Sequence, residues 1–160
     1  MDKILSPDQA IQLATGLNKK DKRIVLVGGC FDILHIGHIT FLEEAKKQGD
    51  VLFVLLESDE TIKKLKGPNR PFNIQHDRAI ILSSLSMIDY VIKLSPITDN
   101  KEYDNLVIQI KPAIIATTAG DSTRIHKERQ AKLLDAKVID VTTPVSNRST
   151  SRLVDFLKEL

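Results

Sequence analysis

The residues of this chain with the clearest chemical potential are two histidines three positions apart, His35 and His38, with a glycine between them. They end the stretch GGCFDILHIGH, which follows the apolar run RIVLV and precedes a helix-like segment. A strand would therefore meet a helix here. Glycines let a backbone approach a ligand, and a helix start offers free N–H groups and the positive end of its dipole. This place suits a phosphate, whose oxygens imidazoles can hydrogen-bond while charge develops in a transition state.

A transition-metal site and a purely structural role are the alternatives for this pair. The other histidines, His76 and His126, show no ligand spacing, and Cys30 is the only cysteine. We therefore favour the phosphate interpretation and expect no metal held by protein ligands alone.

The composition describes an ordinary globular protein. The 160 residues suffice for one domain, and 23 basic against 21 acidic side chains give a formal net charge of +2. This balance argues against a dedicated nucleic-acid binder but allows a local basic pocket. A lone cysteine fits the cytoplasm, the longest apolar run is too short to span a bilayer, and the first residues lack a secretory pattern, so we expect a cytoplasmic protein without a membrane partner.

Strand-like and helix-like segments alternate along the chain. The expected strands are 23–28, 51–57, 90–94, 113–118 and 137–142, and the expected helices are 7–17, 38–49, 74–86, 102–110, 124–135 and 149–160. This alternation predicts a single-domain, doubly wound (Rossmann-like) α/β fold, with a five-stranded parallel sheet and helices on both faces. Ligands of such folds bind beyond the carboxyl ends of the strands, where the histidine pair would lie.

The first helix is expected from a capping box, Ser6 with Gln9, and from Pro7 at its first position. Residues 1–20 form an N-terminal helical extension of the single domain, 1–160. Its apolar face covers either its own domain or the surface of a second copy.

Four blocks in order carry a resemblance to a known family: residues 29–50, 58–73, 77–91 and 147–157. Together they resemble the nucleotidyltransferase superfamily with the H-x-G-H motif. Within it the chain is most similar to the small cytidylyltransferase-like enzymes, such as heptose-1-phosphate adenylyltransferases and glycerol-3-phosphate cytidylyltransferases. The resemblance extends over residues 23–157.

The resemblance implies that a phosphate or phosphonate oxygen attacks the α-phosphorus of a nucleoside triphosphate and that pyrophosphate leaves. Mg²⁺ would accompany the triphosphate, held mainly by substrate and water. The implied catalytic residues are His35, His38, Lys66 and Arg78. The implied nucleotide-binding residues are Gly29, Cys30, Phe31, Gly37, His38, Thr117, Thr118, Gly120, Asp121, Arg148, Ser149 and Thr150. The implied substrate-binding residues are Asp32, Lys66, Arg70 and Arg78, and Asp32 is also expected to orient its neighbours.

A cationic segment, IKKLKGPNR, supplies Lys63, Lys64, Lys66 and Arg70 beside Gly67 and two prolines. We expect a mobile loop that closes over the triphosphate and excludes water. A solvated surface is the alternative for any one of these lysines.

Departures from the heptose-type pattern occur at Gly28, Glu57, Thr118 and Ser122, where those relatives have Asn, Asn, Lys and Tyr. We expect an ATP-dependent enzyme acting on a sugar phosphate like heptose 1-phosphate, with Thr117, Thr118 and Ser122 near the base or sugar. A CTP-dependent glycerol-3-phosphate or polyol-phosphate cytidylyltransferase is the alternative, and a non-catalytic nucleotide-binding module is an alternative of another class. The resemblance also implies a homodimer.

Overall fold

The computed structural model describes residues 2–96 and 99–144, and every structural statement below concerns these residues. The expected helix 149–160, with Arg148, Ser149 and Thr150, lies outside them.

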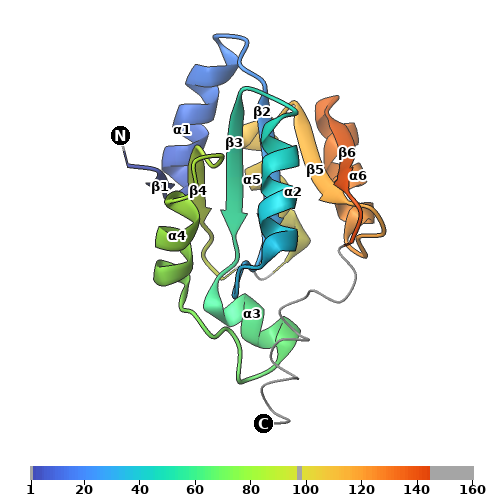
Figure 1. Ribbon diagram of the computed structural model, residues 1–160. Helices are drawn as coiled ribbons and strands as arrows, with labels where there is room; N and C mark the ends of the chain where they lie inside the picture. The colour runs from blue at the N-terminus through green and yellow to red at the C-terminus, as the bar shows by residue number, and fades with distance from the viewer. Residues whose placement is uncertain (1, 97–98, 145–160) are drawn as a thin grey trace.

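Six parallel strands form one sheet in the order β1-β4-β3-β2-β5-β6 (Figure 1). The strands are β1 (Ile4–Leu5), β2 (Ile24–Gly29), β3 (Val51–Leu56), β4 (Tyr90–Lys93), β5 (Ile114–Thr118) and β6 (Lys137–Thr142). The predicted doubly wound parallel sheet is confirmed, with one strand more than expected. Strand β1 has only two residues, too few to show any periodicity in the sequence.

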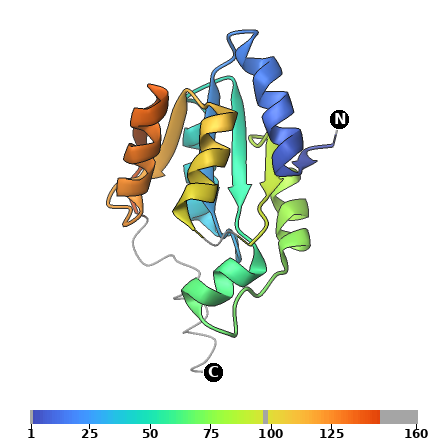
Figure 2. The same ribbon diagram turned by 180° about the vertical axis from the view of Figure 1, so that it is seen from behind.

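Helices cover both faces of this sheet, as Figures 1 and 2 show from opposite sides. Helices α1 (Pro7–Asn18), α5 (Asn100–Ile110) and α6 (Arg124–Leu134) share one apolar core, and α2 (Ile36–Lys46) and α4 (Gln75–Ser83) share the other. Successive side chains of a strand point to opposite faces. Ile24 and Leu26 of β2 therefore pack in the first core, and Val25 and Val27 pack in the second.

Helix α1 begins as its sequence predicts. The Ser6 hydroxyl accepts from the Gln9 N–H at 3.3 Å, and the Gln9 side chain accepts from the Ser6 N–H at 2.8 Å. Ala10 and Ala14 are fully buried in the core that α1 shares with α5. The apolar face of this helix thus covers its own domain.

Helix α3 (Asp59–Lys66) corrects the expectation of a cationic loop. The Ser58 hydroxyl caps it by accepting from the Thr61 N–H at 3.1 Å, and Gly67 ends it with a φ of 97°. Three of the four cations therefore stand on the last turn of a helix: Lys63, Lys64 and Lys66. The helix lies beyond the carboxyl end of β3 (Figure 1), so these charges still stand at the ligand-bearing edge of the sheet. Closure of this segment over a triphosphate stays a prediction.

Among the described helices, none is both long enough and apolar enough to span a bilayer.

Candidate functional site

The turn after β2 depends on two glycines. A Cβ at position 28 would lie 2.5 Å from the Tyr103 hydroxyl oxygen, and a Cβ at position 29 would lie 2.9 Å from the Phe31 ring. Phe31 itself has a φ of 44°, a left-handed conformation that costs energy for a bulky residue. Its ring packs against His38, with centroids 5.4 Å apart. The consecutive glycines therefore let two aromatic side chains crowd around the backbone at the end of β2.

The histidine pair stands at the start of α2, as predicted. The Nδ1 of His35 accepts from the Gly37 N–H at 3.1 Å, and the Nδ1 of His38 accepts from the His35 N–H at 3.4 Å. An imidazole that accepts at Nδ1 carries its proton on Nε2 when neutral. Neither Nε2 has a hydrogen-bond partner within residues 2–96 and 99–144. Each ring thus offers one N–H donor.

Both imidazoles are neutral at pH 7. Burial lowers the pKa of His38 to about 4, helped by the adjacent His35 and the positive charge of Lys66. Burial also lowers the pKa of His35. The two rings, with centroids 3.9 Å apart, can therefore approach one anion without repelling each other as cations.

A cavity of about 420 Å³ lies in front of this pair. It is lined by every described residue that the sequence implicated in nucleotide binding: Gly29, Cys30, Phe31, Gly37, His38, Thr117, Thr118, Gly120 and Asp121. Three segments distant in the sequence meet here, since the turn between β2 and α2, the end of β5 and the end of β6 share one edge of the sheet. The volume falls within the range typical of small-molecule sites.

At the β5 edge of this cavity, Asp121 is held by Lys127 and Thr117. The Lys127 ammonium donates to Asp121 Oδ2 at 2.5 Å and to Thr117 Oγ1 at 2.9 Å, and the Thr117 hydroxyl donates to Asp121 Oδ2 at 2.7 Å. Burial alone would raise the pKa of Asp121. These hydrogen bonds, with those from Thr123, lower the pKa by more than burial raises it, so the carboxylate stays ionised.

This network bears on two expected base contacts. Thr117 lines the cavity, but its side chain is fully buried and its hydroxyl is engaged by Asp121 and Lys127, so its contact with the base or sugar stays a prediction. Ser122 lines neither cavity described here, whereas Thr118 does line the first. The sequence analysis missed Lys127, because a lysine on a polar helix carries no signal of its own.

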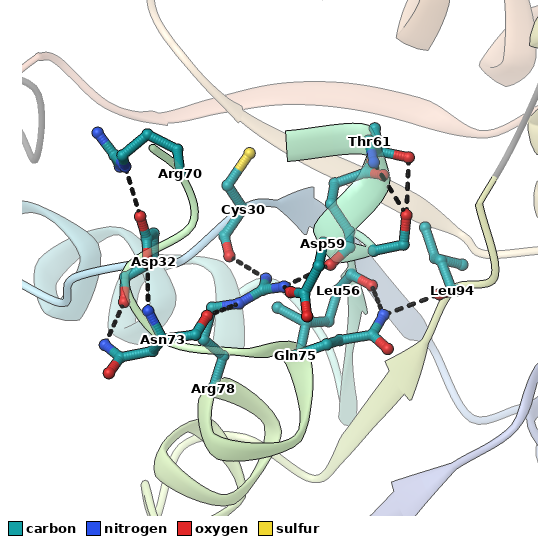
Figure 3. A network of polar contacts seen from close by, with 12 residues as sticks. Cys30, Asp32, Leu56, Asp59, Thr61, Arg70, Asn73, Gln75, Arg78 and Leu94 are labelled. Carbon is teal, nitrogen blue, oxygen red and sulfur yellow. Dashed lines mark hydrogen bonds and ion pairs between the residues drawn. The ribbon is translucent and has the colours of Figure 1, made fainter. Parts of the chain in front are cut away.

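Arg78 is enclosed by protein atoms (Figure 3), and it lines neither cavity, so its expected catalytic and substrate-binding roles stay predictions. Its side chain is completely buried, and all its nitrogens donate to the protein. The acceptors are the carbonyls of Asn73, Cys30 and Glu57, at 2.9, 2.6 and 2.9 Å, and the Asp59 carboxylate at 2.7 Å. One guanidinium thereby fastens the glycine turn to the end of β3 and to the segment before α4.

Asp32 and Arg70 bind each other instead of facing a cavity. Arg70 Nε donates to Asp32 Oδ2 at 2.6 Å, and the N–H groups of Phe72 and Asn73 donate to Asp32 Oδ1. Burial alone would raise the pKa of Asp32, but these three hydrogen bonds outweigh it, so the pKa lies below its ordinary value. Neither residue lines either cavity, so the orienting role of Asp32 and the substrate contacts of both residues stay predictions. One atom, Arg70 Nη2, is buried without a partner in the described part of the chain.

Lys66 is exposed at the end of α3, and its charge helps to lower the pKa of His38. Burial raises the pKa of the Cys30 thiol above its ordinary value, and the charge of Lys66 reduces this rise. The expected action of Lys66 on the same anion as the histidine pair stays a prediction.

The described side chains do not fit a metal ion held by the protein. Within the described ranges no group of three or more His, Cys, Asp or Glu residues could hold one. The carboxylates of Asp32 and Asp121 are already engaged by cationic side chains.

A second cavity, of about 390 Å³, lies on the α5 and α6 side of the sheet and was not predicted. It shares Gly28, Gly29, Cys30 and Lys127 with the first cavity. Of the four departures from the heptose-type pattern, Gly28 and Glu57 line this second cavity, and Gly28 and Thr118 line the first.

Comparison with known proteins adds a family match. A family model described as Cytidylyltransferase-like matches residues 26–155. The bifunctional protein HldE of Campylobacter fetus is 38% identical over 156 residues, 98% of this chain and 31% of the relative. HldE of Campylobacter jejuni subsp. doylei is 44% identical over 151 residues, 92% of this chain and 30% of the relative. The chain thus spans about a third of the length of these relatives.

Two solved structures are also similar. The lipopolysaccharide core biosynthesis protein from Thermoplasma volcanium has a TM-score of 0.62 and 26% identity, over 79% of this chain and 99% of that one. The pantoate-beta-alanine ligase from Francisella tularensis has a TM-score of 0.61 and 18% identity, over 92% of this chain and 69% of that one. The second likeness supports the fold alone.

Proposed function

This chain belongs to the cytidylyltransferase-like family of nucleotidyltransferases, and on that premise we propose that it transfers a nucleoside monophosphate from a nucleoside triphosphate to a small phosphorylated acceptor. The observation that carries the proposal is the pair of Nε2–H donors, from His35 and His38, at the wall of the first cavity. The positive end of the α2 dipole and the charge of Lys66 also suit a polyphosphate at this place.

In the proposed reaction an oxygen of the acceptor phosphate attacks the α-phosphorus. The bond from that phosphorus to the bridging oxygen of the β-phosphate breaks, and pyrophosphate leaves with the electron pair. The acceptor phosphate is already ionised at neutral pH, so the protein need not supply a base. Its contribution is to position the two anions and to neutralise charge.

The histidines supply the donors for this step. Their neutral rings place two N–H groups at the phosphates without the solvation cost of two buried cations. As charge moves to the leaving pyrophosphate, these hydrogen bonds and the one to Lys66 strengthen. Arg78, Asp32 and Arg70 hold the surrounding backbone in place, and they do so without touching the substrate.

The nucleotide occupies the first cavity in this proposal, with Gly29, Cys30, Phe31 and Thr118 along it. Mg²⁺ would accompany the triphosphate and would neutralise part of its charge.

We further propose that the nucleotide is ATP and the acceptor a sugar phosphate resembling heptose 1-phosphate. The similarity to the lipopolysaccharide core biosynthesis protein from Thermoplasma volcanium supports a sugar acceptor. CTP with glycerol 3-phosphate is the second candidate. A pocket that hydrogen-bonds one base leaves polar groups unpaired with the other, so we expect a clear preference.

The test is pyrophosphate release from ATP and from CTP, each with heptose 1-phosphate, mannose 1-phosphate and glycerol 3-phosphate. We expect release with ATP and a sugar phosphate. His38→Ala should lower kcat about a hundredfold or more with a smaller effect on nucleotide affinity. His76→Ala, at an exposed position of α4, is the matched control.

Two results would contradict the proposal. Nucleotide binding by calorimetry without pyrophosphate release from any pair would favour a non-catalytic nucleotide-binding module. Wild-type turnover by His38→Ala on the best acceptor would remove the role of the histidine.

A further inference from the structure

The second cavity shares its floor with the first. Gly28, Gly29, Cys30 and Lys127 line both, although the first cavity is also lined by residues at the start of α2 and the second by residues of α5 and α6. The glycines at positions 28 and 29 add no side chain to their part of the shared wall. A ligand in the second cavity can therefore reach the same turn that a nucleotide would reach from the other side.

Two polar groups face this second cavity without partners in the described chain. One is the carboxyl of Glu57, just beyond β3, and the other is the hydroxyl of Tyr103 on α5. Both residues are half-buried. Unpaired polar groups in such a place cost free energy unless water or a ligand satisfies them.

The Tyr103 hydroxyl occupies the space that a side chain at position 28 would need. A Cβ there would lie 2.5 Å from the hydroxyl oxygen but 3.9 Å from the ring carbon that bears it. Gly28 is thus matched to a tyrosine, and a phenylalanine at 103 would leave room for a Cβ. Burial and the neighbouring Glu57 raise the pKa of Tyr103, so the hydroxyl keeps its proton and can donate.

The rest of the lining defines what the cavity can take. Leu26, Leu65 and Ile115 supply apolar surface, and the Lys127 ammonium at the shared edge is held by Asp121 and Thr117. Burial raises the pKa of Glu57, and the nearby charge of Arg78 offsets only part of this rise. An anionic body would meet the Glu57 carboxyl, so a neutral ligand fits better. A polyol has hydroxyls for Glu57 and Tyr103 and C–H faces for the apolar wall.

We propose that the second cavity binds the hydroxyl-bearing body of the acceptor, recognised by Glu57 and Tyr103, and that the pairing of Gly28 with Tyr103 determines which acceptor fits. The acceptor's phosphate then reaches the shared glycine turn, where the nucleotide's α-phosphate comes from the other side. This assignment rests on the proposed function and adds to it an acceptor site with named recognition groups.

The experiment measures KM for mannose 1-phosphate or heptose 1-phosphate, and separately KM for ATP, in single variants and one double variant. Tyr103→Phe removes one donor, so the acceptor KM should rise on the order of three- to tenfold with the ATP KM unchanged. Glu57→Gln should raise the acceptor KM on the order of tenfold or more. Tyr90→Phe removes the hydroxyl of the only other tyrosine, which lies outside both cavities, and serves as the matched control.

Gly28→Ala tests the steric match directly. Alone it should raise the acceptor KM more than Tyr103→Phe, because its Cβ displaces the tyrosine. Combined with Tyr103→Phe, its Cβ meets the ring carbon at an ordinary contact distance. The double variant should therefore match Tyr103→Phe alone, a non-additive result. Circular dichroism and melting temperature confirm that each variant is folded.

The outcomes separate this inference from the function beneath it. No pyrophosphate release by the wild type with any acceptor would refute the proposed function, and the acceptor site with it. Normal release combined with equal acceptor KM values for Tyr103→Phe and Tyr90→Phe would refute the acceptor site alone. A rise in the ATP KM instead of the acceptor KM would assign the second cavity to the nucleotide, which also overturns the inference.

Discussion

The enclosed guanidinium of Arg78 gives the strongest prediction about stability. Replacing it with methionine keeps a long side chain in the same space but removes four hydrogen bonds, one of which is also an ion pair. Three of the acceptors are backbone carbonyls around a completely buried side chain. The fourth, the Asp59 carboxylate, has a side chain 27% exposed and can regain water.

The expected loss follows from these partners. A buried polar group left unpaired costs about 1–3 kcal/mol, and breaking a buried ion pair by removing one partner costs about 3–5 kcal/mol. Because the carboxylate rehydrates and the three carbonyls do so only in part, we expect Arg78→Met to lower the free energy of unfolding by about 3–5 kcal/mol. For a chain of this length that corresponds to a fall in Tm of about 6–20 °C.

Urea denaturation followed by circular dichroism measures this loss, with calorimetry for Tm. The matched control is Arg129→Met, which removes an exposed arginine paired with Asp104, and which should cost less than about 1 kcal/mol. A loss for Arg78→Met as small as the control's, accompanied by a large fall in kcat, would refute the positioning role. It would restore the catalytic role that the sequence suggested.

The other predictions concern charge, the lysines and assembly. Because the pKa of His38 is about 4 in the folded protein against 6.5 ordinarily, the unfolded chain takes up that proton first as the pH falls. Stability should therefore fall from pH 6.5 towards pH 4 more steeply in the wild type than in His38→Gln; parallel denaturation curves for the two proteins would contradict this. Nucleotide should raise the His38 pKa, measured by NMR titration, and an unchanged value at saturation would place the phosphates elsewhere. Lys66→Ala should lower kcat by at least tenfold and Lys63→Ala by far less; equal effects would assign no special role to Lys66. We also expect a homodimer, since Ile80 and Ile81 of α4 are 48% and 42% exposed; sedimentation at micromolar concentration that shows only a 17.9-kDa species would exclude it.

Local patterns in the sequence were sufficient to predict the framework of the site. The apolar run before GGCFDILHIGH and the capping residues after it are signals confined to a few neighbours, so β2, the turn and α2 could be placed together. The capping box at Ser6 and Gln9 is of the same kind. Since all the strands are parallel, their carboxyl ends necessarily share an edge, and the residues after β2 and β5 were correctly expected to meet.

The sequence could not show the contacts of side chains whose partners lie far away along the chain. Arg78 and Arg70 have the residue type of a phosphate ligand, but the first is enclosed by carbonyls and the second is paired with Asp32. Thr117 was expected to face a ligand because it ends a strand, but Lys127, ten residues later, engages its hydroxyl. Tertiary contacts at such separations leave no trace in local spacing.

The second cavity escaped prediction for a related reason. Gly28 and Tyr103 are complementary in shape, and Glu57 comes from a third segment. The sequence alone does not show that the Tyr103 hydroxyl occupies the space beside Gly28, so it could not predict this pairing.

The shared glycine turn has a consequence for the order of events in catalysis. With the nucleotide entering beside α2 and the acceptor beside α5 and α6, neither substrate lies across the other's route. Either one can then bind to the free protein, and the reaction proceeds through a ternary complex without a covalent enzyme intermediate. Steady-state rates should give intersecting, not parallel, double-reciprocal plots. Pyrophosphate, which leaves by the nucleotide's route, should compete with ATP and not with the acceptor. The thin backbone wall between the two cavities would thus make the kinetic mechanism random in its order of addition.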